Sequence, residues 1–275
     1  MAILIFFVAH WQLSVFFQSF FLHRYGAHKQ FTMSKTWEKI FHFLAWAVGG
    51  ASYLSPRAYA ILHRMHHAYS DTEKDPHSPI VTPNLFKMMW KTKVLYTGLR
   101  SGTIKADPKF EGDTPSWPLL DGPLSSWPAS IAWGTLYTLF YMHFATAWWQ
   151  YLLVPIHYLM GPIHGAIVNW CGHKYGYRNF KSDDASKNTL VFDVLTMGEL
   201  FQNNHHKFGQ SPNFAARWFE IDPAYAAIRV FGWLGILDLS GSQKMKYREA
   251  KAREEAAALE APVVPQLASS AMDGE

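Results

Sequence analysis

The sequence predicts an all-α fold: an integral membrane protein whose helices carry a helical cytoplasmic cap with a histidine-rich metal site. Two observations predict this class. Residues 1–22 and residues 129–172 contain no Asp, Glu, Lys or Arg, although the mean hydropathy of the whole chain is only -0.08. Eight of the 14 histidines fall into four short elements instead of being scattered. A helix needs about 20 apolar residues to cross about 30 Å of hydrocarbon, so both uncharged stretches are long enough.

Three membrane spans are expected from these stretches. The first is residues 1–22, which lacks a basic leading segment and a small-residue cleavage site and therefore predicts a retained anchor, not a signal peptide. The second stretch contains Pro155 and is long enough for two spans, residues 129–149 and 151–172, joined by a turn near Gln150.

A third apolar run, residues 40–54, is short and contains Gly49 and Gly50. We expect a buried or interfacial helix here, because a crossing would separate the histidines before it from those after it. Residues 1–23 and 110–173 contain no Lys or Arg, which places all 25 basic residues in the other segments. Basic residues favour the cytoplasmic side, so the N-terminus is predicted outside and the histidine elements in the cytoplasm. A soluble protein with buried core helices is the alternative.

The remaining segments complete a membrane domain over residues 1–243. Residues 70–128 read as a polar connector rich in turn signals, and residues 174–243 as a second, helical cytoplasmic section. Residues 244–275 are predicted to be a charged tail that begins as a helix and is disordered beyond Pro262.

Composition also limits the chemistry. Cys171 is the single cysteine, which excludes an internal disulfide, a thiolate zinc site and a cysteine-ligated iron–sulfur cluster built from this chain alone. The net charge of +4 is not accompanied by a nucleic-acid-binding motif, so no nucleic-acid partner is expected. Any metal must be held mainly by nitrogen and oxygen.

The four histidine elements have spacings that suit metal ligation. They are HRYGAH (His23, His28), HRMHH (His63, His66, His67), NWCGH (His173) and QNNHH (His205, His206). On a helix His63 shares a face with both His66 and His67, whereas His66 and His67 diverge by about 100°. One helix can therefore serve two ions, and His205 with His206 can do the same. His23 and His28 lie about 140° apart on a straight helix, which requires a loosened helix end near Gly26.

Eight imidazoles exceed the four to six ligands that one such ion takes, so two ions are predicted. Nitrogen donors suit zinc, copper, iron or nickel. Five scattered histidines are expected to be ordinary core or interfacial residues: His10, His42, His143, His157 and His164.

These elements resemble the histidine boxes of the integral-membrane fatty-acid desaturases, in particular the stearoyl-CoA desaturases and their bacterial relatives. HRYGAH matches the HxxxxH box, HRMHH the HxxHH box, NWCGH the asparagine–histidine element and GELFQNNHH the last box; DTEKDPHSP is also similar. The resemblance covers roughly residues 1–240. It implies a centre of two iron ions (Fe²⁺/Fe³⁺) that uses O₂ to introduce a cis double bond, at the delta-9 position, into a fatty acyl chain.

The resemblance also assigns the site residues. All eight clustered histidines are implied as metal ligands, with Asn169 acting through water. The stearoyl-CoA type has histidine where this chain has Gln202, so either Gln202 or a water completes that coordination sphere. The family commonly has two spans before the first box, whereas one is predicted here.

The expected substrate follows from the same resemblance, and the expected electron donor from motifs that the sequence lacks. A fatty acyl substrate on coenzyme A or lipid, a surrounding membrane and a bent apolar substrate tunnel are implied. No haem or dinucleotide-binding signature occurs, so electrons are expected from a separate ferredoxin, rubredoxin or cytochrome. Asp71, Asp75 and Glu199 are candidates to orient ligand imidazoles. A di-iron membrane hydroxylase is the nearest alternative enzyme, and a metal carrier with ligands inside the spans is the alternative without catalysis.

Overall fold

The computed structural model describes residues 1–260 and is mostly helical, as the sequence predicts. The chain divides into two compact units, residues 1–245 and residues 246 onward. The helical elements are α1 (Ala2–Phe17), η1 (Gln18–Ala27), α2 (Lys35–Gly49), η2 (Gly50–Ser52), α3 (Pro56–Tyr69), α4 (Leu85–Ser101), η3 (Pro108–Phe110), α5 (Pro118–Asp121), η4 (Pro123–Ser125), α6 (Trp127–Phe144), η5 (Trp148–Leu153), α7 (Val154–Lys174), α8 (Gln202–Lys207), α9 (Pro223–Trp233) and α10 (Tyr247–Glu260).

Two continuous helical segments of the described chain are long and apolar enough to cross a membrane. They are Ala2–Ala27, with a mean hydropathy of 1.6, and Trp148–Lys174, with a mean hydropathy of 1.3. The predicted span at 129–149 corresponds to α6, which does not meet this measure because Thr, Tyr, Trp and His interrupt its apolar sequence. The turn predicted near Gln150 instead lies at 145–147, and η5 leads directly into α7.

The apolar run at 40–54 forms most of α2, which is not among the two candidate spans. One face of α2 buries Phe41 and Ala45 against the core, while Phe43 and Leu44 remain exposed. The helix ends at Gly50, whose φ of +51° is left-handed; a Cβ there would lie 1.9 Å from the hydroxyl oxygen of Tyr137. This partly buried amphipathic helix agrees with the predicted buried or interfacial position.

The first span changes its helical geometry where the first histidine element begins. Residues of η1 form a π-helix, and the backbone N–H of His28 donates to the carbonyl oxygen of His23 at 3.0 Å. The wider turn brings residues five apart close to one face, which a straight α-helix cannot do. The predicted loosening near Gly26 is therefore confirmed, and it takes the form of a π-helix that continues the span.

An aromatic core lies beside the end of this span. Phe20 of η1 contacts Phe41 of α2 and Phe231 of α9, with ring centroids 4.9 and 5.6 Å apart. Two short antiparallel strands, β1 (Thr32–Met33) and β2 (Leu237–Asp238), connect the chain after η1 to the chain after α9. This packing fixes the histidine-bearing end of the first span against the C-terminal part of residues 1–245.

The section predicted to be helical at 174–243 is largely irregular before α8. Side chains satisfy its backbone: the amide oxygen of Asn203 accepts from the N–H groups of Asn179 and Phe180, both at 2.8 Å. Glu220 accepts from the side-chain amides of Asn179 and Asn204, at 2.6 and 2.8 Å. The prediction of a helical section was wrong for residues 175–201 and 208–222, where buried side-chain amides replace helical hydrogen bonds and hold α8 in place.

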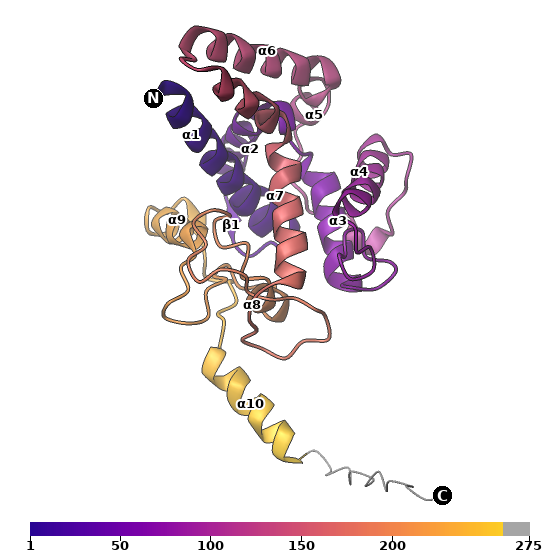
Figure 1. Ribbon diagram of the computed structural model, residues 1–275. Coiled ribbons are helices and arrows are strands. Elements are labelled where there is room, and N and C mark those ends of the chain that lie inside the picture. The colour runs from indigo at the N-terminus through magenta and orange to yellow at the C-terminus, as the bar shows by residue number, and fades with distance from the viewer. Residues whose placement is uncertain (261–275) are drawn as a thin grey trace, which may run out of the picture. The chain divides into compact units, whose positions relative to one another are not determined.

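Within residues 1–245, Figure 1 shows α8 close to the end of α7 that carries the third histidine element. His23 of η1 and His173 of α7 lie toward the C-terminal ends of the two candidate spans. In the second unit α10 agrees with the predicted charged helix. The disorder predicted beyond Pro262 concerns residues outside the described part of the chain.

Candidate metal centre

The eight clustered histidines meet in two groups. His23, His28, His63, His67 and His205 form the first group, and His66, His173 and His206 form the second. Within each group every residue offers a ligand atom within 4.8 Å of the others. The groups adjoin each other, since the ring centroids of His67 and His206 are 4.5 Å apart.

Two helices divide their histidines between the groups in the way their spacing predicts. His63 and His67, one turn apart on α3, face the first group, and His66 between them faces the second. On α8 the adjacent His205 and His206 diverge into the first and second groups. The divergence of about 100° between neighbouring helical residues is what lets each helix serve both groups.

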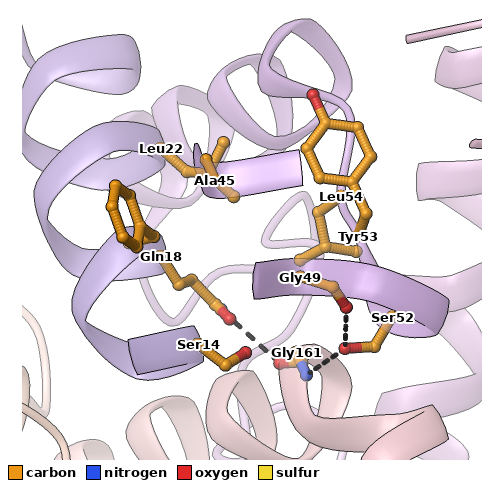
Figure 2. A pocket seen from close by; sticks show the side chains of 10 residues that line it. Ser14, Gln18, Leu22, Ala45, Gly49, Ser52, Tyr53, Leu54 and Gly161 are labelled. Carbon is orange, nitrogen blue, oxygen red and sulfur yellow. Dashed lines mark hydrogen bonds between the residues drawn. The ribbon is translucent and has the colours of Figure 1, made fainter. Parts of the chain in front are cut away.

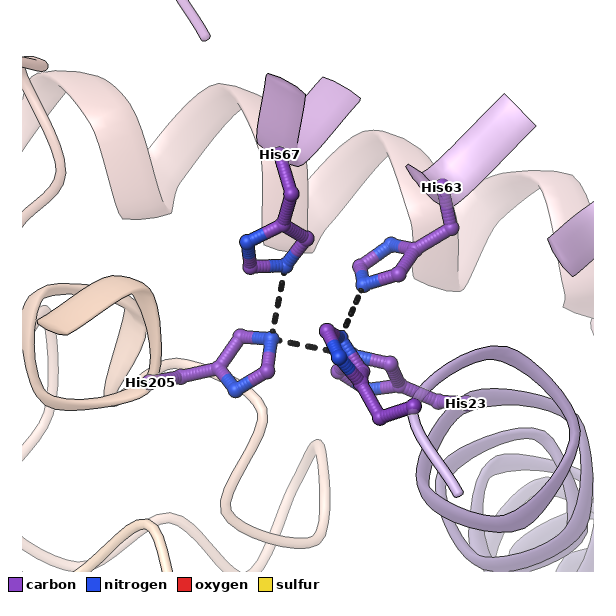
Figure 3. A group of neighbouring side chains, drawn as sticks. His23, His63, His67 and His205 are labelled. Atoms are coloured by element: carbon purple, nitrogen blue, oxygen red, sulfur yellow. Dashed lines mark hydrogen bonds between the residues drawn. The ribbon is translucent and has the colours of Figure 1, made fainter. Parts of the chain in front are cut away.

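In the first group the Nε2 atoms of different histidines point toward one another. Nε2–Nε2 distances are 2.7 Å for His28 with His63, 2.9 Å for His67 with His205, and 3.1 Å for His23 with His205 (Figure 3). Two nitrogens that bind one ion at about 2.0–2.1 Å are about 2.8–3.4 Å apart when the angle between them is octahedral or tetrahedral. The spacings of 2.9 and 3.1 Å lie within this range and the spacing of 2.7 Å lies just below it, which is close to what ligands around a single ion require.

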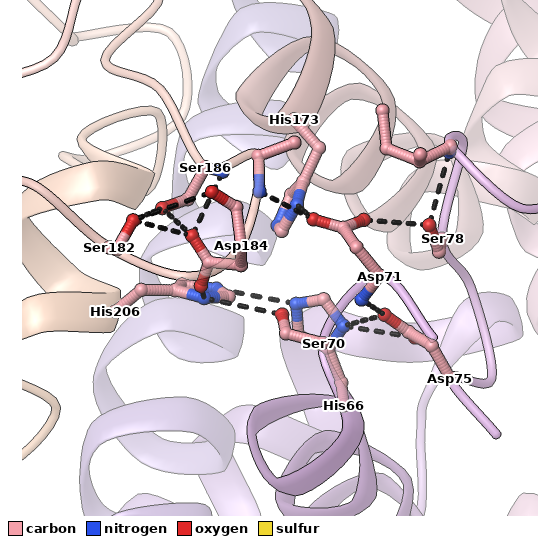
Figure 4. A network of polar contacts seen from close by, with 12 residues as sticks. His66, Ser70, Asp71, Asp75, Ser78, His173, Ser182, Asp184, Ser186 and His206 are labelled. Atoms are coloured by element: carbon pink, nitrogen blue, oxygen red, sulfur yellow. Dashed lines mark hydrogen bonds and ion pairs between the residues drawn. The ribbon is translucent and has the colours of Figure 1, made fainter. Parts of the chain in front are cut away.

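In the second group each imidazole is backed by a carboxylate, as Figure 4 shows. The Nδ1 atoms of His66 and His173 lie 3.0 Å from carboxylate oxygens of Asp75 and Asp71, and Nδ1 of His206 lies 2.6 Å from Asp184. In the first group Nδ1 of His23 lies 2.5 Å from a carboxylate oxygen of Glu199.

Asp71, Asp75 and Glu199, which were predicted to orient ligand imidazoles, thus each contact one of the clustered histidines, and their orienting role stays a prediction. Asp184 was missed because it follows the second box by more than a hundred residues and lies in a polar loop, where only the fold brings it to His206.

These carboxylates determine which nitrogen is available to a metal. Asp75, Asp71 and Asp184 each accept the proton on Nδ1 of their histidine, so Nε2 of that histidine carries a lone pair. His66 and His206 are both held in this way, and their Nε2 atoms face each other at 3.3 Å. Two lone pairs at this distance repel unless a cation lies between them. Nε2 of His173 is likewise buried and has no hydrogen-bond partner in the described part of the chain.

Electrostatics keeps these groups in the protonation states that metal binding needs. Burial lowers the pKa of His28, His63, His67 and His205 well below the usual value, and neighbouring histidines add to the effect. Burial also lowers the pKa of His206, to about 4.

The carboxylates are held in their ionised form. Burial alone would raise the pKa of Asp71, but His173 outweighs it and lowers the pKa to about 2. Burial also raises the pKa of Glu199, but His23 and then Arg24 outweigh it and lower the pKa to about 2. His28, His63, His67, His205 and His206 are therefore expected to be neutral near neutral pH, and Asp71 and Glu199 to be ionised.

The two predicted ligands that are not histidines, Asn169 and Gln202, each lie four residues before a histidine of the second group. Asn169 is one helical turn before His173 on α7 and is half-buried. Gln202 begins α8 and is 2% exposed, and its amide nitrogen donates to the carbonyl oxygen of Glu199 at 2.6 Å. This bond leaves Oε1 as the amide atom of Gln202 that could bind a metal or water. The ligand roles of both residues stay predictions.

The predicted substrate tunnel also stays a prediction. Figure 2 shows a cavity of about 20 Å³ between the first span, α2 and α7. Ser14, Gln18 and Ser52 contribute polar groups to it, and Gln18 donates to the carbonyl oxygen of Gly161 at 3.5 Å. This volume is enough for about one water molecule and far too small for a fatty acyl chain.

The histidines expected to be structural mostly have ordinary partners. The two Nδ1 atoms of His10 and His157 are 2.7 Å apart, His42 contacts the hydroxyl of Tyr53 at 2.9 Å, and His143 is exposed. His164 is buried on α7 outside both groups. One further histidine, His77, which the sequence did not single out, lies beside His66 and Asp75.

Comparison of the sequence with known proteins identifies the family to which it is similar. Residues 1–232 match the family model described as fatty acid desaturase. The chain is 28% identical to the Delta-9 desaturase-like 5 protein of Arabidopsis thaliana over 226 residues, covering 79% of this chain and 70% of that protein. It is 26% identical to the sn-1 stearoyl-lipid 9-desaturase of Anabaena variabilis over 231 residues, or 78% and 74% of the two chains. It is also 26% identical to the hex-5-enoyl-[acyl-carrier protein] acetylenase of Moorena producens over 262 residues, or 84% and 74%.

Proposed function

Because the chain belongs to the fatty acid desaturase family, we propose that it introduces a cis double bond into a saturated fatty acyl chain, at the delta-9 position, in an O₂-dependent reaction at a two-iron centre. The family makes it an oxidoreductase, a desaturase that is associated with a membrane and acts on fatty acyl chains. The delta-9 position is supported by relatives that are named for it, including two stearoyl-lipid 9-desaturases.

The observation that carries the proposal is the opposed pair of His66 and His206. Both rings have Nδ1 occupied by a carboxylate, so both Nε2 lone pairs are directed at a gap of 3.3 Å. A cation that binds both nitrogens removes the repulsion. Imidazole nitrogens at these distances suit a transition metal and do not suit calcium or magnesium.

The proposed ligands are the eight clustered histidines, five at the first ion and three at the second, with Asn169 acting through water and Gln202 as a further candidate. Bound iron would supply the activation of dioxygen and the oxidising power to remove hydrogen from a methylene, which no side chain can provide. The chain's own contribution is to fix each imidazole: Asp75, Asp71 and Asp184 set the tautomers at the second ion.

We place the centre on the cytoplasmic side of the membrane, in a cap beneath the spans. Both candidate spans bring their ligands to their C-terminal ends, which puts these ends on one side. The segments 24–109 and 174–253 around the histidines contain all of the Lys and Arg residues, which favours the cytoplasm. Electrons would come from a separate ferredoxin, rubredoxin or cytochrome, and the acyl group would arrive on coenzyme A or as a lipid.

Expression in cells that lack their own desaturase, with a working electron donor, tests this function. Fatty-acid profiling should reveal a monounsaturated product for the wild-type chain and for His143→Ala, whose histidine is exposed on α6. His66→Ala should yield none, because it removes a ligand of the second ion. An unchanged profile for iron-loaded wild-type protein would count against desaturation, and a hydroxylated product would indicate the related hydroxylase reaction.

A further inference from the structure

The loop of residues 191–195, a few residues before α8, has an inverted pattern of exposure. Its four apolar side chains are exposed in the described part of the chain: Val191, Phe192, Val194 and Leu195. The polar side chains beside them are buried, since Asp193 and Thr196 are both 0% exposed. A loop that faces water is expected to show the opposite arrangement, with polar groups outside. The outer face of the 191–195 loop therefore suits an apolar surrounding.

The polar groups of this loop find partners on its inner side. The carboxylate of Asp193 accepts hydrogen bonds from the backbone N–H groups of Thr196 and Leu200, at 2.9 and 2.8 Å, and from the Thr196 hydroxyl. The N–H of Gly198 donates to the carbonyl oxygen of Asp193 at 3.0 Å. Irregular backbone at membrane depth is tolerated only where the protein itself satisfies its polar groups. Asp193 provides such partners while its apolar neighbours face outward.

Two contacts place the loop beside the candidate spans. The indole N–H of Trp11, on α1, donates to the carbonyl oxygen of Leu195 at 3.1 Å. Met197 packs against a buried cluster that includes Trp11 and Met160 and joins α1 to α7. Trp11 and Met160 both lie near the middle of a candidate span. The loop therefore lies alongside the spans and not beyond their ends.

The spans are longer than the hydrocarbon layer is thick. A helical segment of 26 residues, such as Ala2–Ala27, extends about 39 Å, whereas the hydrocarbon is about 30 Å thick. The histidine-bearing end can thus protrude from the bilayer while the level of Trp11 stays within it. At that level the spans expose apolar side chains as well, because Leu13 on α1 and Leu159 on α7 are about half exposed. The 191–195 loop continues this apolar surface.

Resting on the membrane placement in the proposed function, we infer that the 191–195 loop inserts its four apolar side chains into the acyl region of the bilayer, beside the first span. The partner of this surface is lipid hydrocarbon, and not a second copy of the chain or a soluble protein. Glu199 and α8 follow the loop directly in the sequence. Insertion of the loop thereby anchors to the membrane the segment that carries His205 and His206.

Cysteine accessibility in phosphatidylcholine vesicles tests this insertion. In the full chain carrying Cys171→Ala, Phe192→Cys and Leu195→Cys should react with a water-soluble maleimide at least about tenfold more slowly than Asp183→Cys. The thiolate is the reacting form, and each unit by which an apolar surrounding raises the thiol pKa lowers the thiolate fraction about tenfold. Asp183→Cys is the matched control because Asp183 is exposed in the same section before α8.

A fluorophore attached to these cysteines before reconstitution identifies what covers them. At positions 192 and 195 its emission should be quenched by phospholipids that carry a nitroxide on the acyl chain. Slow labelling without this quenching would mean that protein covers the loop and would overturn the inference, as would labelling as fast as that of Asp183→Cys.

Leu13→Cys on α1 is the reference for the first span, and it should label slowly and be quenched by the same lipids. Protection of Leu13→Cys together with rapid labelling in the loop would refute the insertion alone. Rapid labelling of Leu13→Cys would instead refute the membrane placement in the proposed function and, with it, the inference.

Discussion

Replacing Asp184 by Asn changes one charge and leaves the side chain's shape nearly intact. The Oδ1 atom of Asp184 accepts hydrogen bonds from the Ser182 hydroxyl at 2.8 Å and from the Ser186 N–H at 3.0 Å, and Oδ2 accepts from His206 at 2.6 Å. In Asp184→Asn the amide oxygen must keep the place of Oδ1, so the NH₂ group faces Nδ1 of His206. Two donors cannot face each other, so the proton of His206 moves to Nε2, the atom expected to bind the metal.

The expected loss is at the upper end of the range for residues that orient metal ligands. Such changes typically weaken metal binding 10- to 100-fold, and inversion of the tautomer should make it about 100-fold, or about 2.7 kcal/mol. Only the second ion should be affected. Chelator titration of iron-loaded protein measures this, with Asp183→Asn as the matched control because Asp183 is an exposed neighbouring carboxylate. Release of the second ion from Asp184→Asn at the wild-type chelator concentration would refute the reasoning.

Three other perturbations have defined outcomes. Glu199→Gln should lower the affinity for the first ion about 10- to 100-fold and leave the affinity for the second unchanged, because the Glu199 carboxylate contacts His23. An equal loss of affinity for both ions in the same titration would contradict this. In metal-free protein the folded pKa of His206, about 4, lies below its unfolded value of 6.5, so the unfolded chain binds more protons between these values. The free energy of unfolding should therefore fall by about 2 kcal/mol from this residue between pH 7 and pH 5, and a rise in denaturation experiments would be inconsistent. Gly134→Ala places a Cβ 1.6 Å from the Tyr158 hydroxyl and should cost about 1–3 kcal/mol in thermal unfolding without changing the iron content; no recovery on adding Tyr158→Leu would argue against this clash.

The sequence predicted most of the site because helical spacing is a local property. The separation of His63 and His67 from His66, and of His205 from His206, follows from about 100° per residue and agrees with the structure. The need for altered geometry at HRYGAH could also be derived, although the π-helix that provides it could not.

Contacts between residues far apart in the sequence could not be predicted from helical spacing. Asp184 meets His206 only because buried amides fold the irregular segment 175–201 beneath α7 and α8. His77 appeared to be an isolated histidine in a polar connector. The expectation of a third span at 129–149 rested on the absence of charge, whereas α6 is too rich in Thr, Tyr and Trp to meet the measure of length and hydropathy.

The central claim is that two metal ions are held side by side by imidazoles from η1, α3, α7 and α8. Iron content per chain, measured together with X-ray absorption at the iron edge on protein purified from iron-supplied cells, tests it most directly. We predict two ions per chain, a first shell dominated by nitrogen, and loss of this pattern in His66→Ala. One ion or none per chain, or a first shell dominated by oxygen, would contradict the account.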